Sequence, residues 1–419
     1  MNRRDLLLAG GSLLIGGKRG RGQSPVSART QQQAGPQTRL LEALQKNRLP
    51  VTMSDGHPSG RGWDWLVQQA RDARFTLIGE EHGVAETAQL SAALFNALRG
   101  SGYTRMAIEL SPIIAQDIEA AARRNGLQGI LDFYAVPTTW HPQYLREEAQ
   151  LIASVINGTP KGERVLWGLD REILSDRYLI ARLEPKVPKR ARESFGRLKQ
   201  ASATSWASST PFIFSQNPDP AVVSAVRAEW PNPDRDSDMI LRTLEASLAI
   251  NAASTAWDSS DRRAQWMRNN FAARLREEQK RGSLPKVMMK FGYNHMIRGE
   301  NYVNIFDLGS MPDELAQLNG GRAFHIIMLP GPGSRQAVLG PGRSFTSVSS
   351  DEFDEFKAGD QRLTKVLSNA NATGHEAIDL RALRPLATRG LDAWNSDVVR
   401  TILGYDAAVI WKGARASSP

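Results

Sequence analysis

The sequence contains no cysteine. Disulfides, thiolate nucleophiles, and zinc or iron–sulfur sites built on cysteine are therefore excluded. No Gly-x-Ser-x-Gly motif is present either, which argues against a standard serine hydrolase. No apolar run reaches the roughly twenty residues that a membrane-spanning helix needs. We therefore expect no stable membrane insertion of the mature protein.

The excess of basic residues has a local source. The net charge is +9, and residues 1–28 contribute +4 of it through five basic side chains and one acidic side chain. The other Lys and Arg residues are scattered, without the basic stripe and interleaved aromatics that follow a phosphate backbone. Nucleic acid is therefore not an expected partner, and we expect a small-molecule or peptide substrate.

The N-terminal segment resembles a twin-arginine export signal. Arg3 and Arg4 precede a weakly hydrophobic stretch from Leu6 to Gly17, and residues 26–28 offer a small-residue cleavage site. We predict a signal peptide at 1–28 and export to the periplasm or the medium. A polar linker rich in Gln, Gly, Pro and Ser is expected at 29–60, with one short helix near 40–45.

Beyond the linker, short apolar segments alternate with helical patterns, which predicts an α/β domain over 61–415. We expect three layers, with a mostly parallel central sheet covered on both faces. The predicted strands are 74–79, 104–109, 164–170, 286–292, 323–329 and 407–411. Residues 172–284 show apolar periodicity without strand signals, so we expect an inserted helical subdomain there. It serves either as a wall or lid over the site or as a structural brace.

Ionisable residues follow four of these predicted strands. Ligands of an open parallel sheet bind at the carboxyl ends of its strands, so these residues are expected to converge. A histidine near carboxylates is suited to proton transfer at neutral pH and to metal binding. Two Gly-x-x-His motifs, each directly after an apolar strand, make a functional site the favoured interpretation, with glycine expected to provide a turn with positive φ. The converging residues are Glu80, His82, Glu86, Glu109, Asp170 and His295.

These motifs resemble the erythromycin esterase-like group, together with ChaN-like haem-binding proteins and Tiki/TraB-type metalloproteases. The resemblance rests on residues 79–86, 107–109 and 167–170, and continues at 263–270, 290–295 and 405–411. It covers roughly 70–415. It implies a hydrolase, with Arg263, Tyr293 and Asn294 as binding residues. The single residue between Glu80 and His82 is more similar to the ChaN and Tiki spacing.

Water activation against an ester, lactone or amide is the leading functional hypothesis. We expect His82 as general base or metal ligand, Glu80 or Glu86 to orient it, and His295 as second base, ligand or oxyanion stabiliser. If a divalent metal is bound, Zn, Mn or Fe suits the set His82, His295, Glu109 and Asp170. The alternative is a ChaN-like protein that binds haem or iron through the same histidines or Tyr293. His141 is interpreted as a surface-loop residue.

Overall fold

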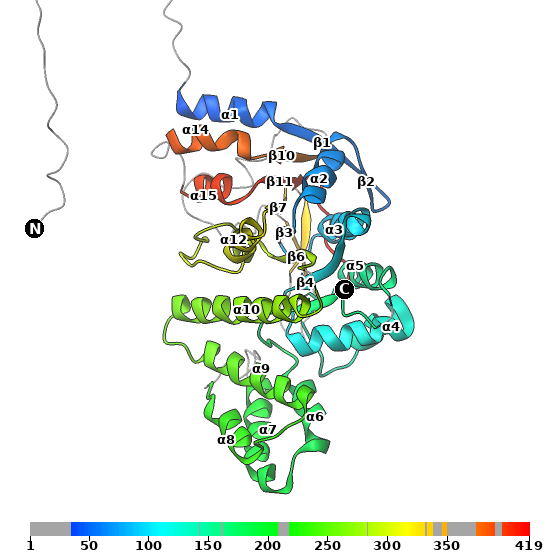
Figure 1. Ribbon diagram of the computed structural model, residues 1–419, viewed down its shortest axis with the longest axis vertical. Coiled ribbons are helices and arrows are strands. Elements are labelled where there is room, and N and C mark those ends of the chain that lie inside the picture. The colour runs from blue at the N-terminus through cyan, green and yellow to red at the C-terminus, as the bar shows by residue number, and fades with distance from the viewer. Residues whose placement is uncertain are drawn as a thin grey trace, which may run out of the picture. The chain divides into compact units, whose positions relative to one another are not determined.

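The computed structural model describes residues 35–141, 143–160, 162–207, 218–282, 284–331, 333–337, 346–349, 374–389 and 396–419. The expected signal peptide lies outside these ranges. Figure 1 shows the described elements, with a central sheet between two groups of helices.

The sheet has nine strands in the order β2-β1-β10-β11-β7-β3-β6-β4-β5. Six neighbouring strands, from β11 to β5, are parallel, and the other three form an antiparallel edge. The fold is therefore the three-layer, mostly parallel α/β class that the strand–helix alternation predicts. The strands are β1 (Arg48–Ser54), β2 (His57–Ser59), β3 (Phe75–Glu80), β4 (Tyr103–Ile108), β5 (Leu166–Gly168), β6 (Lys286–Gly292), β7 (Ala323–Pro330), β10 (His375–Asp379) and β11 (Ala407–Trp411). A separate two-stranded sheet pairs β8 (Ser334–Ala337) with β9 (Thr346–Ser349).

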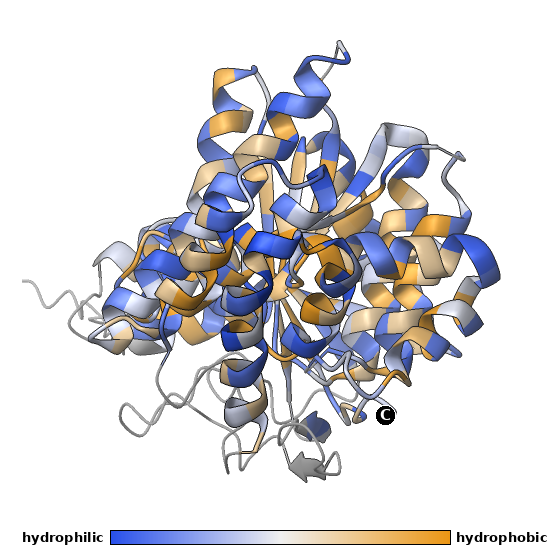
Figure 2. Ribbon diagram, turned by 90° about the horizontal axis from the view of Figure 1, so that it is seen from below, coloured by the Kyte–Doolittle hydropathy of each residue, from blue (hydrophilic) through white to orange (hydrophobic). Residues whose placement is uncertain are grey.

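Two hydrophobic cores lie on opposite faces of the sheet. Along β3, Phe75 and Leu77 belong to one core and Ile78 to the other, as the two-residue repeat of a strand requires. One face is covered by α2 (Arg61–Asp72), α3 (Ala85–Leu98), α4 (Pro112–Tyr134) and α5 (Arg146–Asn157) (Figure 1). The other is covered by α1 (Pro36–Lys46), α10 (Ala256–Gln279), α12 (Ser310–Leu318), α14 (Arg384–Arg389) and α15 (Ser396–Gly404). Figure 2 shows the apolar strands at the centre, enclosed by helices with hydrophilic outer faces.

The antiparallel edge departs from the expected polar linker. Residues 36–59 form α1, β1 and β2, and β1 pairs with β10 through the register Arg48↔Ile378 to Val51↔His375. The segment has the composition of a linker because it forms the edge of the sheet. Only Val51 of β1 is buried, so the other residues of this strand need not be apolar. The helix expected near 40–45 extends over the whole of α1.

In the described parts of the segment between β5 and β6, all the regular secondary structure is helical. The helices are α6 (Asp176–Leu183), α7 (Arg192–Trp206), α8 (Ala221–Glu229), α9 (Arg235–Asn251) and α10. Thr255 caps α10 by accepting a hydrogen bond from the Asp258 amide. Ala264, Met267, Phe271 and Leu275 form its buried stripe, at the spacing of an amphipathic helix. Among the residues that the structure describes, no helix has both the length and the apolar character to cross a bilayer.

Candidate functional site

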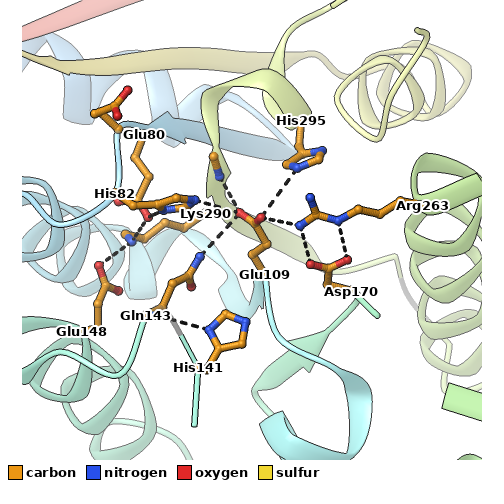
Figure 3. Close-up of polar contacts among 12 residues, drawn as sticks. Glu80, His82, Glu109, His141, Gln143, Glu148, Asp170, Arg263, Lys290 and His295 are labelled. Atoms are coloured by element: carbon orange, nitrogen blue, oxygen red, sulfur yellow. Dashed lines mark hydrogen bonds and ion pairs between the residues drawn. The ribbon is translucent and has the colours of Figure 1, made fainter. Parts of the chain in front are cut away.

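The expected residues converge at the carboxyl ends of four parallel strands. Glu80 ends β3, Glu109 follows β4, Asp170 follows β5, and His295 lies in the short helix α11 (Tyr293–Met296) that directly follows β6. Figure 3 shows these side chains, with His82, around the carboxylate of Glu109. Parallel pairing of β3 with β6 and of β4 with β5 and β6 places the ends side by side.

The His82 imidazole lies between two carboxylates. Its Nδ1 is 2.9 Å from Oε1 of Glu80, and its Nε2 is 3.5 Å from Oε2 of Glu109. The His82 side chain is 37% exposed, whereas Glu80 and Glu109 are buried. Partial burial opposes protonation of the ring, but Glu109 and Glu80 outweigh it and raise the pKa of His82 above 6.5. Of these three side chains, His82 is therefore the one that water or a substrate can reach.

Lys290 holds Glu80 in its ionised form. The Lys290 ammonium donates to Oε1 of Glu80 at 2.6 Å and to Oε1 of Glu148 at 2.7 Å, and all three residues are buried. Burial alone would raise the pKa of Glu80, but Lys290 and His82 lower it below its ordinary value. An ionised Glu80 accepts a hydrogen bond from Nδ1–H of His82, which fixes the tautomer of the ring.

Glu109 connects the two histidines. One oxygen accepts the Gly292 amide hydrogen at 2.7 Å and faces His82, and the other accepts from Nη2 of Arg263 at 2.6 Å and lies 3.6 Å from Nε2 of His295. Burial would raise the pKa of Glu109, but His82, His295 and Arg263 hold it far below its ordinary value. Glu109 is thus an anion that stabilises positive charge on either imidazole.

His295 repeats the arrangement of His82 with a different carboxylate. Its Nδ1 is 2.8 Å from Oδ2 of Asp307, which also accepts from Asn301 at 3.2 Å and from the Leu308 amide at its other oxygen. Burial opposes protonation of His295, but Asp307 and Glu109 together outweigh burial and Arg263, and the pKa is raised. Both imidazoles therefore have Nδ1 braced by one carboxylate and Nε2 turned toward Glu109.

Helix α10 brings a cation to the two acids that follow β4 and β5. Arg263 binds Asp170 through Nε at 2.9 Å and Nη2 at 2.6 Å, and the same Nη2 contacts Glu109. Asn270, two turns further along the same face, donates to the Leu169 carbonyl at 2.8 Å. The part of the helical segment formed by α10 is thus a wall of the site.

The glycines of the two Gly-x-x-His motifs serve a different purpose from the one expected. Neither has positive φ, and φ of Gly292 is −50°. A Cβ on Gly79 would lie 2.8 Å from Cα of Tyr293, and one on Gly292 would lie 3.1 Å from Nε2 of His82. The requirement is therefore steric: each position lets a segment of the other motif approach closely.

Glu86 does not belong to this network, which corrects its expected catalytic role. Its carboxylate accepts from Nε of Arg415 at 2.7 Å and from the Arg415 amide at 3.0 Å. The helix α3 that carries Glu86 begins after the loop that contains His82, and its first turn faces the C-terminal segment. Glu80, not Glu86, is the carboxylate that orients His82.

Two of the expected binding residues have partners within the fold. Oδ1 of Asn294 accepts from the Tyr302 amide at 3.2 Å, and the ring of Tyr293 packs edge-on against Tyr302 with centroids 5.5 Å apart. The hydroxyl of Tyr405 donates to the Tyr293 carbonyl. These contacts fix the backbone of α11 and so the direction of His295.

The arrangement of these side chains fits a pair of carboxylates bridged by an arginine better than it fits a metal site. Within the described ranges, no group of three His, Asp or Glu side chains is arranged to hold a metal ion. Of the expected ligands, Glu109 and Asp170 both accept hydrogen bonds from Arg263, whose charge partly offsets theirs.

Lys290, Asp307 and Glu148 were absent from the predicted site. The role of Lys290 could have been predicted, because a lysine within the apolar strand Lys-Val-Met-Met-Lys-Phe-Gly must have a buried partner of opposite charge. Asp307 lies in an irregular segment twelve residues after His295, where no periodicity marks it. Glu148 lies on the buried face of α5.

Comparison with known proteins gives the fold. No family model and no curated protein matches the chain. A crystal structure of a succinoglycan biosynthesis protein matches with a TM-score of 0.60 and 13% identity, over 91% of this chain and 98% of its own. A Bacillus cereus protein matches over the same shares with a TM-score of 0.57 and 13% identity. A mutant of erythromycin esterase EreC in its open conformation matches with a TM-score of 0.54 and 14% identity, over 85% of this chain and 94% of its own. At these identities the likeness establishes a common fold.

Proposed function

We propose that the protein is a hydrolase that activates water against an ester, lactone or amide. One observation carries the proposal: the carboxylate of Glu109 lies between two imidazoles, and each imidazole has Nδ1 braced by a further carboxylate. This arrangement supplies two proton carriers at one anionic centre. The common fold with a chain named as an erythromycin esterase supports the same class of reaction.

His82 acts as the general base. Glu80 accepts a hydrogen bond from Nδ1–H, so the neutral ring presents the lone pair of Nε2. Nε2 takes a proton from water while the water oxygen bonds to the acyl carbon, and the imidazolium that forms is stabilised by Glu80 and Glu109. Glu109 itself is a poor base, because its surrounding cations and the Gly292 amide hold its pKa far below that of a histidine.

His295 acts as the general acid. In its protonated form the Nε2–H faces Glu109 from the other side, with Asp307 holding Nδ1. As the tetrahedral intermediate collapses, the bond from carbon to the leaving oxygen or nitrogen breaks and that atom takes the proton from His295. His82 then carries the proton gained from water, and exchange with solvent restores both rings.

The charge of the site favours neutral or cationic substrates over anionic ones. Carboxylates outnumber the fixed cations, since Glu80, Glu109, Glu148, Asp170 and Asp307 stand against Lys290, Arg263 and Arg171. A phosphate or carboxylate group on the substrate would add a like charge in a partly buried site, which costs free energy. We therefore propose uncharged esters, lactones or amides.

A hydrolysis panel tests the proposal. The purified chain is assayed against p-nitrophenyl esters, small lactones, a macrolide lactone and anilides, beside His82→Asn and the control His57→Asn, whose residue is exposed on β2. We expect hydrolysis by the wild type and the control, and a loss of about 100-fold or more in kcat for His82→Asn. Equal rates for His82→Asn and the wild type would contradict the proposal.

Haem or iron binding through the same histidines stays a prediction of the sequence. An absorption spectrum after addition of hemin tests it independently of the hydrolysis panel. No contact in the site favours it over hydrolysis, because Tyr293 packs on Tyr302 and both histidines have their Nδ1 atoms braced by carboxylates.

A further inference from the structure

His141 lies beside the candidate site, although the sequence predicts that its loop is on the surface. It is only 4% exposed and lies between α4 and α5. The loop is fixed on both sides, since the Trp140 amide donates to Oγ of Ser175 at 3.1 Å and Oγ1 of Thr139 donates to the Phe133 carbonyl at 2.7 Å. The direction of the imidazole is therefore set before any ligand binds.

Hydrogen bonding assigns the tautomer of His141. The backbone amide of Gln143 donates to Nδ1 at 3.1 Å, so this nitrogen is an acceptor and carries no proton. The proton of the neutral ring is then on Nε2. That Nε2 atom is buried and has no hydrogen-bond partner in the described part of the chain. A buried donor without a partner is uncommon in folded proteins and calls for an acceptor that the described residues do not supply.

The ring of His141 lies near the residues of the candidate site. Gln143, two residues along the same loop, donates to Oε2 of Glu109 at 3.5 Å, and Figure 3 shows His141 beside Gln143 below Glu109 and Asp170. Burial lowers the pKa of His141 to about 4, against the opposing effect of Asp170 and Glu109. The ring is therefore neutral at pH 7, and its N–H is a donor without a charge.

We propose that Nε2–H of His141 donates to the carbonyl oxygen of the bound substrate and to the oxyanion that forms from it. The proposal rests on the proposed hydrolysis and adds a catalytic residue to it. The oxygen gains negative charge when water adds to the carbon, and a preorganised donor is worth most at that moment. Glu80, Glu109, Asp170 and Asp307 are acceptors in this cluster and cannot serve this purpose, while Arg263 is shared by two of them.

Two variants separate the donor from the packing of the ring. His141→Leu keeps apolar volume and removes the donor, whereas His141→Gln keeps an N–H donor at a similar reach and a carbonyl that accepts from Gln143. With a neutral p-nitrophenyl ester we expect a loss of about 100-fold or more in kcat for His141→Leu. KM should change little, and His141→Gln should recover a substantial part of kcat. Thermal unfolding of both variants is recorded in parallel.

A binding measurement extends the test beyond turnover. Phenylboronic acid forms a tetrahedral anion that resembles the hydrolysis intermediate, and its Kd is measured for wild type, His141→Leu and His141→Gln. We expect at least 10-fold weaker binding by His141→Leu and a shift of the Nε2 proton resonance of His141 in the wild type.

The outcomes distinguish the two proposals. Hydrolysis by the wild type with undiminished kcat and unchanged boronate Kd in His141→Leu overturns the role of His141 alone. A kcat loss that His141→Gln does not restore, with an unchanged boronate Kd, also overturns it and leaves a packing role. Absence of both hydrolysis and boronate binding in the wild type overturns the proposed function, and the role of His141 with it.

Discussion

Arg263 and Glu109 are joined by a 2.6 Å ion pair although 154 positions separate them. The arginine comes from α10, the last helix of the long segment between β5 and β6, and the glutamate directly follows β4. The same guanidinium binds Asp170, so one cation partly offsets the charge of two buried acids. The helical segment therefore supplies a cation to the acids that follow β4 and β5.

Replacing Arg263 is expected to destabilise the fold and the site together. Arg263→Gln removes the guanidinium that donates to both Glu109 and Asp170, which costs about 3 kcal/mol of unfolding free energy. Urea unfolding at pH 7 measures this loss. Arg262→Gln is the matched control, because Arg262 pairs with Asp258 on the exposed side of the same helix and such pairs contribute about 0.5 kcal/mol. Equal losses of unfolding free energy in the two variants would show that Arg263 stabilises the fold no more than an exposed arginine does.

The pH profile of kcat/KM is expected to follow the carboxylate beside His82. Glu80 raises the pKa of His82, and the base must be unprotonated, so wild-type activity falls as pH drops through a pKa above 6.5. Glu80→Gln removes one of the raising charges and lowers that pKa. The acidic limb of the profile therefore moves to lower pH, while kcat falls because the imidazolium is less stabilised.

Lys290 keeps Glu148 as a partner in Glu80→Gln, so the variant is expected to remain folded. Glu147→Gln is the control, since Glu147 binds Ser418 on another side of α5. An acidic limb that stays in place or moves to higher pH in Glu80→Gln would contradict the assignment of His82 as the base.

The two motif glycines are expected to respond differently to alanine. Gly79→Ala places a Cβ against the backbone of Tyr293 and should lower stability by about 1–3 kcal/mol. Gly292→Ala meets Nε2 of the partly exposed His82, which has room to move. That variant should stay folded and lose about 10- to 100-fold in kcat/KM.

Gly196→Ala is the control for both, because its added Cβ meets no atom within 4 Å. Thermal unfolding and ester hydrolysis are measured for all three variants. Wild-type kcat/KM in Gly292→Ala would mean that His82 does not need its present position.

The sequence predicts the positions of the parallel strands better than it predicts the contacts of individual side chains. Apolar runs such as 407–411 coincide with strands because strands buried on both faces are mostly apolar. Convergence of Glu109 and His295 follows from the topology of a parallel sheet. The antiparallel edge escapes notice because Val51 is the only buried residue of β1 and β2, so neither strand forms an apolar run.

Side-chain partners within the cluster depend on contacts across the fold. Asp307 reaches His295 through a loop of no regular pattern, and Glu86 turns to Arg415, more than three hundred positions away. The glycine motifs mark close approach of two chain segments, which spacing alone does not distinguish from a turn.

Export in the folded state is a further prediction from the N-terminal arginine pair. Replacing Arg3 and Arg4 with lysine should leave the protein in the cytoplasm with residues 1–28 uncleaved. Cell fractionation followed by N-terminal sequencing measures this. Unchanged accumulation outside the cytoplasm would contradict a twin-arginine signal. A wild-type N-terminus that begins near residue 29 would support it.

The double variant of the two histidines tests the central claim most directly. His82 and His295 both face Glu109 through Nε2, so we propose that they act as one unit. The measurement is kcat/KM for a neutral ester in wild type, His82→Asn, His295→Asn and the double variant, with folding checked by circular dichroism. The account predicts that either single change removes nearly all activity and that the double change costs little more. Losses that multiply in the double variant would mean independent roles and would contradict it.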